Sequence, residues 1–328
     1  MIDDNKRTFA AWCDADAAGA GRSIERFVAN AFAPGAVLHA PCPIDDCGDR
    51  DDALARFWRP LLTAFPDLER RDDILIAGSW KESDWVAACG HWEATFAAPW
   101  LGIAPTGGAV SLRYGEFHRF AAGAIVESYM LIDIPDLMRQ ARQWPFAPAR
   151  GVQDRWPGPA TRDGVQLAPH TDESGRKSLA LVEAMIAGLM QYDGKTLDSM
   201  GQERFWREGF MWYGPSPIGT GRGLKGFQDV HQRAFLSAFP DRKGGDHKCR
   251  IGQGAYVGST GWPSIRATHT GPGFIGLPAS GRAITMRVMD FWRREADLLA
   301  ENWVFIDIPD LLRQLDAPLW DADGARMP

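Results

Sequence analysis

Two aspartates in identical surroundings are the clearest candidates for acid/base chemistry. Asp133 and Asp307 each take the second position of the hexapeptide Ile-Asp-Ile-Pro-Asp-Leu. A carboxylate in an apolar cavity has a raised pKa, so it can remove a proton from carbon next to a carbonyl and later return it. The pattern also favours helix capping, because Asp often precedes a first helical turn and Pro is tolerated there. Both interpretations stay open.

Further polar residues of the second half could complete such a site. His231 and His269 could donate hydrogen bonds to an enolate oxygen, and Asp290 is an additional acid. We predict that His231 and His269 are catalytic together with Asp307. The competing interpretations are a packed histidine on a helix for His231 and a turn residue for His269.

The hexapeptide belongs to an internal repeat. Ile132–Leu137 recurs as Ile306–Leu311, and the same offset of 174 residues carries Ala64–Asp67 onto Ala238–Asp241 without a gap. A period of this length predicts two copies of a whole domain rather than a solenoid. We expect domains at 1–146 and 172–328, joined by an ordered linker at 147–171, and an intrachain pseudo-dimer of the two halves.

Each copy has an α+β pattern, with helices first and strands after. In the first copy, apolar residues at helical spacing predict helices from about residue 6, from Ser23 and from Asp51 or Asp52. The period then changes to two, which predicts strands at 74–76, 85–96, 109–120 and 125–134, followed by a helix at 135–143. The second copy repeats this order.

The last two strands of each copy form a predicted hairpin. If residues 121–124 make the turn, Phe120 faces Ile125 and alternation places His118 opposite Glu127. The offset then places Asp290 opposite Trp303. Acids and aromatic residues share one sheet face in this register, and 14 tryptophans in the chain suit a pocket for an aromatic ligand. The predicted substrate-binding residues are Trp303, Asp290, Trp292, Met286, Phe305, Trp212, His118 and Tyr129.

Composition excludes several other classes of protein. The net charge of −6 argues against nucleic acid and anionic membranes as partners, and no apolar run is long enough to span a membrane. The polar start is unlike a signal peptide, and the five cysteines form no Cys-x-x-Cys motif, so we expect a cytoplasmic protein with reduced thiols. The histidines show no metal-ligand spacing, so no metal and no cofactor are predicted.

Several motifs of the second half follow one order along the chain. They are Trp212–Pro215, Gly219–Leu224, His231, Thr268–Gly271, Gly276–Pro278, Glu301–Trp303 and Leu311–Leu315. With these motifs the sequence resembles the SnoaL-like polyketide cyclases of the NTF2-like superfamily. The resemblance implies two tandem cones of curved antiparallel sheet and helices, each around an apolar pocket. It also implies a cofactor-free aldol closure with an Asp as acid/base, which corresponds to Asp307 and, through the repeat, to Asp133.

The first half departs from this pattern. By the offset, Trp85, Ala97 and Phe57 replace Ser259, Gly271 and His231. Large side chains should shrink a cavity, so we predict an active second pocket and a structural first one.

Three functions fit such a cone, because this fold hosts many. The first is a cyclase or isomerase that abstracts a proton from a small hydrophobic or aromatic polyketide-like substrate. The second is another acid/base enzyme, such as a dehydratase or an epoxide hydrolase. The latter would pair an acid with Asn or Arg around a water, and the predicted register puts Asn302 on the wrong strand face. The third is a non-catalytic module that binds a small molecule or a partner.

Overall fold

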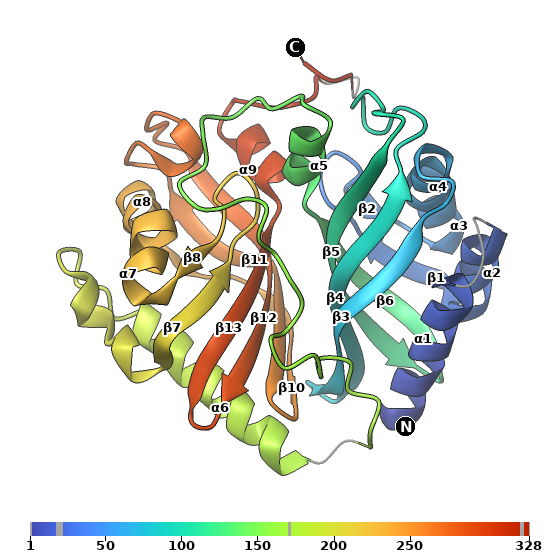
Figure 1. The fold of residues 1–328 in the computed structure, drawn as a ribbon, viewed down its shortest axis with the longest axis horizontal. Helices are drawn as coiled ribbons and strands as arrows, with labels where there is room; N and C mark the ends of the chain where they lie inside the picture. The colour runs from blue at the N-terminus through green and yellow to red at the C-terminus, as the bar shows by residue number, and fades with distance from the viewer. Residues whose placement is uncertain (1, 18–21, 170–171, 322–324, 328) are drawn as a thin grey trace. The chain divides into compact units, whose positions relative to one another are not determined.

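The computed structural model describes residues 2–17, 22–169, 172–321 and 325–327. Within them the chain divides into two compact units, each with its own sheet (Figure 1). The first unit contains the residues up to Trp144, 162–169 and those from Asp307 onward, and the second contains 145–161 and 172–306. The two separate sheets agree with the prediction of two domain copies.

The first unit places helices before and after a six-stranded mixed sheet with the order β2-β1-β6-β5-β4-β3. Its helical elements are α1 (Ile2–Ala17), α2 (Arg22–Ala31), α3 (Arg50–Ala53), the π-helical turn η1 (Leu54–Trp58), α4 (Arg59–Ala64) and α5 (Ile134–Gln140). Its strands are β1 (Phe32–His39), β2 (Asp46–Cys47), β3 (Glu69–Trp80), β4 (Ser83–Thr95), β5 (Ala109–Ala121) and β6 (Ala124–Ile132). The predicted order of helices followed by a meander is confirmed.

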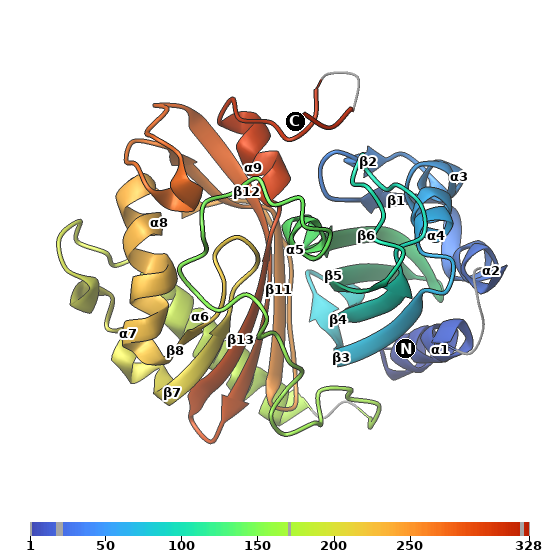
Figure 2. The ribbon, with the colours of Figure 1, turned by 45° about the horizontal axis from the view of Figure 1, so that its top comes forward.

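The second unit repeats this plan around a sheet with the order β10-β11-β12-β13-β7-β8, with β9 paired to β11. Its helical elements are α6 (Asp172–Leu189), the short 3-10 turns η2 (Leu197–Met200), η3 (Gln202–Arg204) and η5 (Phe274–Gly276), α7 (Gly223–Phe227), the π-helical turn η4 (Gln228–Gln232) and α8 (Arg233–Ala238). Its strands are β7 (Trp206–Tyr213), β8 (Gly221–Arg222), β9 (Lys243–Gly244), β10 (His247–Gln253), β11 (Tyr256–Thr268), β12 (Ala283–Glu295) and β13 (Leu298–Ile306). Figure 2 shows α6, α7 and α8 on one side of this curved sheet.

The sequence pattern predicts antiparallel sheets, but each sheet contains one parallel pair of strands. The strand that follows the first helices, β1 or β7, runs parallel to the last strand of its own sheet, β6 or β13. This pairing extends each meander by one strand.

The helix that ends the second copy, α9 (Ile308–Gln314), belongs to the first compact unit. The Arg313 guanidinium donates to the Asp45 carboxylate at 2.6 Å, and the indole N–H of Trp320 donates to the Leu101 carbonyl at 2.7 Å. Packing therefore assigns this segment to the first unit, although the repeat in the sequence assigns it to the second copy.

The described part of the predicted linker is ordered. The indole N–H of Trp156 donates to the Tyr213 carbonyl at 3.2 Å within the second unit. Val165 forms a parallel bridge with Leu75 within the first unit. These contacts confirm the prediction that this segment packs against the domains.

The predicted register of the first hairpin is wrong by one residue. Phe120 pairs with Ile125 as predicted, but Val126 bulges out of β6, and every later pair moves by one position. His118 consequently pairs with Ser128. A one-residue slip moves side chains to the opposite face of a sheet, so this bulge redistributes the predicted residues.

The second hairpin has the same bulge, at Ala300 in β13. Asp290 therefore pairs with Val304 rather than with Trp303. Asn302 and Val304 share the sheet face of Asp290, whereas Trp303 points to the other face. The prediction that Asn302 lies on the wrong face is corrected by this register.

The offset of 174 residues does not hold along β4 and β11. Ala88 pairs with Glu116 in the first unit, and Ser259 pairs with Asp290 in the second. Ala88, rather than Trp85, is therefore the structural counterpart of Ser259. An irregular stretch later in β11 takes up most of the difference.

No helix among the described residues is long and apolar enough to cross a membrane.

Candidate active site

The second unit encloses a cavity of about 260 Å³ between its sheet and its helices. Most of the lining is apolar or aromatic and comes from Met185, Ile186, Leu189, Trp206, Trp212, Phe227, Phe235, Ile265, Met286, Val288, Trp292, Val304 and Ile306. The polar residues of the lining are Gln202, His231, Ser259, Asp290 and Asn302, together with Arg242, Lys243, His247 and Ser264. An apolar pocket with few polar groups is the usual form of a small-molecule site.

Asp290 is the acid of this cavity. Its side chain lies deep in the unit and keeps some accessible surface, which faces the cavity. The Asn302 amide donates to its carboxylate at 3.3 Å. Burial raises the pKa of Asp290 to about 7, against the opposing effects of the Asn302 hydrogen bond and the Arg250 charge. Near neutral pH this carboxyl group can therefore both take up and release a proton.

His231 lines the same cavity and belongs to the π-helical turn η4, an element that often marks functional sites. Its ring stacks on Trp212 at 4.7 Å and on Phe235 at 5.1 Å between centroids. Burial, with a contribution from Arg242, lowers the pKa of His231 to about 3, so the imidazole is neutral. The packed-histidine interpretation is met and the ring also lines the cavity, while the catalytic role of His231 stays a prediction.

Among the lining residues, the buried Nδ1 of His231 and Nε1 of Trp292 have no hydrogen-bond partner in the described part of the chain. A buried polar atom without a partner is costly, and native structures contain few of them. An oxygen atom of a bound ligand would supply the missing partner.

Asp307 and Asp133, the predicted catalytic acids, both cap helices. One Asp307 oxygen accepts the Asp310 N–H at 3.1 Å, and the other accepts the Cys42 N–H at 3.0 Å. Asp133 accepts the Asp136 N–H at 3.2 Å and the Arg113 guanidinium at 3.1 Å. The capping interpretation is confirmed for both.

Asp307 also belongs to the first compact unit, whereas the cavity lies in the second. Its catalytic role, like that of Asp133, stays a prediction.

The remaining predicted residues of the second unit are divided between the two sheet faces. Trp292, Met286, Trp212 and Asp290 line the cavity as predicted. Trp303 and Phe305 lie on the opposite face: the Trp303 indole donates to the Pro157 carbonyl at 2.8 Å, and Phe305 packs on Trp156. The Ala300 bulge accounts for this difference.

His269, the other predicted catalytic histidine, is fully buried at the end of β11 and does not belong to the lining of the cavity. Its Nδ1 is 3.1 Å from the Ser280 hydroxyl, and its ring packs on Phe239 at 5.2 Å. Burial lowers its pKa. These contacts favour the interpretation of His269 as a turn residue over a catalytic role.

The corresponding interior of the first unit contains an ion-pair cluster. The Arg70 guanidinium pairs with Glu116 and, at 2.6 Å, with Asp72, and it lies 4.7 Å from the Tyr114 ring centre. His118 lies 3.2 Å from the Glu116 carboxylate. Although burial raises the pKa of Glu116, these neighbouring groups outweigh it and lower the pKa to about 2.

The two first-unit residues predicted to bind substrate are separated by the sheet. His118 belongs to this cluster, and its Nδ1 is 2.7 Å from the Ser128 hydroxyl. Tyr129 lies on the other face, where it stacks on His39 at 4.4 Å and donates to Glu127 at 2.6 Å.

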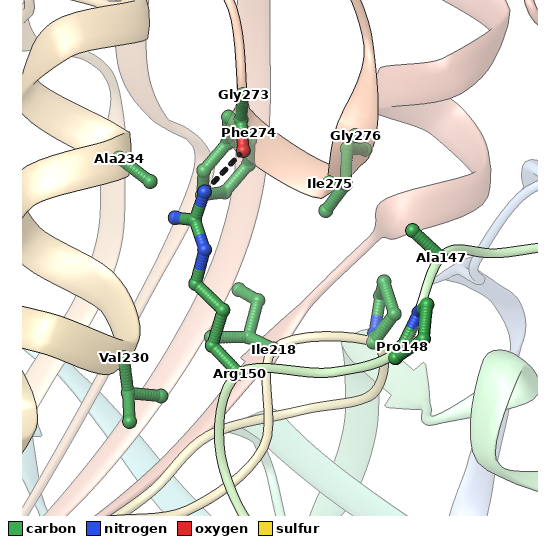
Figure 3. Close-up of a pocket in the computed structure, with 11 residues that line it drawn as sticks. Ala147, Pro148, Arg150, Ile218, Val230, Ala234, Gly273, Phe274, Ile275 and Gly276 are labelled. Carbon is green, nitrogen blue, oxygen red and sulfur yellow. Dashed lines mark hydrogen bonds between the residues drawn. The ribbon is translucent and has the colours of Figure 1, made fainter.

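A second, smaller hollow of about 170 Å³ is lined by residues of η4, α8 and η5 and of the neighbouring loops (Figure 3). Its walls include Val230, Ala234 and Phe274, and the Arg150 guanidinium spans it to donate to the Gly273 carbonyl at 3.0 Å. Arg150 is the single ionisable side chain in this lining. The hollow therefore has no acid or base for catalysis. In the described ranges, no group of three His, Cys, Asp or Glu side chains is placed to hold a metal ion.

The sequence analysis missed Asn302 and Ser259 as cavity residues, and it placed Asp290 among the substrate-binding residues and as an additional acid rather than as the main one. A signal was present in β12, where Met286, Val288 and Asp290 alternate toward one face and continue to Trp292. A carboxylate within such an apolar row is uncommon. The bulge in β13 had no sequence signal that we recognised.

Each unit is an α+β cone in which helices close a curved sheet, the architecture of NTF2-like proteins. The model of the SnoaL-like polyketide cyclase family matches residues 21–141 and again residues 192–315. The chain therefore belongs to the SnoaL-like polyketide cyclase family and contains its domain twice.

Solved structures of similar proteins each align with less than half of this chain. AclR of Streptomyces galilaeus is 23% identical over 45% of this chain and 87% of its own, with a TM-score of 0.38. IdmH of Streptomyces antibioticus is 24% identical over 42% of this chain and 96% of its own, with a TM-score of 0.35. An NTF2-like protein of Burkholderia xenovorans LB400 is 17% identical over 43% of this chain and 98% of its own, with a TM-score of 0.34. No curated protein matches the chain.

Proposed function

We propose that the second unit is a cofactor-independent acid/base catalyst that performs an aldol-type ring closure on a small hydrophobic or aromatic polyketide-like substrate. The observation that carries this proposal is Asp290, a carboxyl group with a pKa of about 7 on the wall of an apolar cavity. Membership of the cyclase family supports the reaction class.

In this scheme, the Asp290 carboxylate removes a proton from carbon next to a substrate carbonyl. The negative charge moves to the carbonyl oxygen, where the unpaired Trp292 N–H and the neutral His231 ring can donate hydrogen bonds. The enolate carbon then attacks a second carbonyl of the same molecule and forms the ring bond. Asp290 returns its proton to the new alkoxide, which leaves the enzyme unchanged.

Asn302 is the positioning residue of this scheme. Its amide donates to Asp290 at 3.3 Å and to the Phe291 carbonyl at 3.0 Å, so the amide is anchored to the strand that carries the acid. This geometry fixes which carboxylate oxygen remains available to the substrate.

One observation favours a second function. Asn302 lies beside Asp290 in the cavity, and the Arg250 charge acts on the same carboxylate. This acid, amide and guanidinium set matches the expectation for an epoxide hydrolase, in which the acid activates a water. Hydrolysis of styrene oxide would distinguish this function from proton abstraction.

The proposal is tested by hydrogen exchange into 2-tetralone, a bicyclic ketone with acidic protons next to its carbonyl. Deuterium uptake in D2O, followed by NMR, should be accelerated by the wild-type protein. Asp290→Asn should lose this acceleration, and Asp307→Asn, which retains a good capping residue, should keep it. If Asp307→Asn loses the acceleration and Asp290→Asn keeps it, the family-derived assignment is right and ours is wrong.

A further inference from the structure

We infer that the natural ligand of this cavity is an apolar anion, an aromatic body with a carboxylate that Arg242 binds at the cavity mouth. This inference rests on the proposed function in one respect, namely that this cavity is the substrate site. It adds the charge and the orientation of the substrate.

The mouth is located by the exposure of the lining residues. Protein encloses Asp290 and His231, which keep a little exposed surface, whereas Lys243, Gly244 and Met190 are exposed. The exposed residues come from β9 and the end of α6, so the cavity opens between these two elements. Arg242 directly precedes β9 and is half-buried in the wall of this opening.

Arg242 makes only neutral contacts in the described residues. One of its terminal nitrogens, Nη2, donates to the Leu189 carbonyl and approaches the Met200 sulfur at 3.9 Å. Its guanidinium carbon lies 5.7 Å from the Tyr192 ring centre and 6.0 Å from that of Phe235. Its Nε and Nη1 have no protein partner in that set.

The least exposed arginines of the described residues are neutralised by carboxylates. Arg70 pairs with Asp72 and Glu116, and Arg293 pairs with Glu301. A charge withdrawn from water is costly unless an opposite charge accompanies it. Burial lowers the pKa of Arg242, and no carboxylate among the described residues pairs with its guanidinium. A ligand anion would supply that partner.

The surroundings of Arg242 reinforce the positive potential of the mouth. Lys243 lines the same opening. The nearest acids along the chain are otherwise engaged: Asp241 accepts the Thr268 N–H at 2.8 Å, and Asp246 pairs with Lys248. The cavity mouth is thus cationic in a protein whose net charge is −6.

Nε and Nη1 lie on different edges of the planar guanidinium, because bidentate pairs use Nε with Nη2 or Nη1 with Nη2, as Arg70 does with Asp72. Each of the two nitrogens of Arg242 can donate one charge-assisted hydrogen bond to an anion such as a carboxylate. The apolar walls between Arg242 and Asp290 suit the aromatic body of the same molecule. A substrate whose carboxylate is held by Arg242 places its other end next to Asp290.

The inference is tested with two probes of nearly equal shape, 2-naphthoate and its neutral methyl ester. Binding is measured near pH 6 by quenching of tryptophan fluorescence in the wild type, in Arg242→Gln and in the control Arg233→Gln. Arg233 is an exposed residue of α8 that pairs with Asp229.

We expect wild type to bind naphthoate roughly tenfold or more tightly than the ester, because hydrogen bonds to charged groups are the strong ones. Arg242→Gln should lose this preference while its affinity for the ester changes less than about twofold, which also shows that the variant is folded. Arg233→Gln should behave as wild type. Equal affinity for acid and ester in wild type, no saturable binding of the acid, or an equal loss of both probes in Arg242→Gln would overturn the inference.

Asp290→Asn separates this inference from the proposed function. Near pH 6 the carboxyl group of Asp290 is mostly neutral, so the variant should bind naphthoate like wild type even though it loses proton abstraction. Retained naphthoate preference with unchanged deuterium exchange in Asp290→Asn would refute the catalytic proposal and leave the anion site standing.

Discussion

Glu116 and Asp290 occupy the same position in the two units, yet their surroundings give them opposite properties. Each lies on the third strand of its meander, opposite Ala88 or Ser259. The Glu116 carboxylate is paired with Arg70 and has a pKa of about 2, whereas burial holds the pKa of Asp290 at about 7. The same backbone therefore fixes a permanent charge in one unit and a titratable acid in the other.

Three pairs of residues account for this difference. By the repeat and the strand registers, Arg70, Trp92 and Tyr114 of the first unit correspond to Gly244, Ile265 and Val288 of the second. All three second-unit residues line the cavity. Loss of the guanidinium removes the partner of the acid, and loss of two large rings creates space. One set of substitutions thus produces both the cavity and the raised pKa.

The largest expected effect is on stability in the first unit. Glu116→Gln should lower the free energy of unfolding by up to about 3–5 kcal/mol, because it removes one of the two carboxylates that pair with the buried Arg70 charge. Urea denaturation of the variant and of wild type measures this difference. Asp290→Asn is the matched change, and it should be neutral or stabilising above pH 7, by at most about 4 kcal/mol, because it removes a carboxylate that burial disfavours. Equal losses in both variants would contradict the contrast between the two acids.

The two acids should also affect stability at opposite ends of the pH range. Glu116 has a folded pKa below its ordinary value of 4.5, so its contribution is present above about pH 4.5 and is lost as the pH falls toward 2. Asp290 has a folded pKa above its ordinary value of 3.8, so its contribution is lost as the pH rises from about 4 through 7. Compared with wild type, the melting temperature of Glu116→Gln should fall less steeply as the pH decreases toward 2. That of Asp290→Asn should fall less steeply as the pH rises toward 7. Unchanged profiles in both variants would argue against these assignments.

Gly244→Arg places the first unit's guanidinium in the second unit. A side chain at this position meets open space, so the backbone should accept it. If the new arginine pairs with Asp290 as Arg70 pairs with Glu116, the pKa of Asp290 falls by one or more units, as is usual beside a guanidinium. The pH midpoint of 2-tetralone exchange should fall with it, and the maximal rate should drop. Gly244→Gln, of similar reach and no charge, should leave the midpoint near 7; the same shift in both variants would attribute the effect to crowding instead.

The smallest expected effect is at the cap of the second copy. Asp307→Ala should cost about 0.5–2 kcal/mol of stability, because it removes the acceptor for a first-turn N–H, whereas Asp133→Ala should cost more, because it also removes a carboxylate from the buried Arg113 guanidinium. Exchange activity should persist in both variants. Loss of activity in Asp307→Ala at full stability would restore its predicted catalytic role.

The fold was predictable from the sequence and the position of the site was not, for one physical reason. The repeat of Ile132–Leu137 and the change of period from helical to alternating identify two α+β domains without any knowledge of register. Side-chain direction in a strand depends on register, and a single bulged residue, Val126 or Ala300, reverses it. The role of Asp307 was not predictable either, because a capping aspartate and a catalytic one look alike in sequence.

The pKa of Asp290 is the most direct measure of the difference between the two units. Carboxyl carbons of aspartate can be labelled with carbon-13 and followed by NMR through a pH titration, with Asp290→Asn identifying the resonance. A midpoint close to 7 is expected if the carboxyl lies in an apolar cavity without a charged partner. A midpoint below about 5, within the ordinary range of aspartate in proteins, would contradict its role as the acid/base of the second unit.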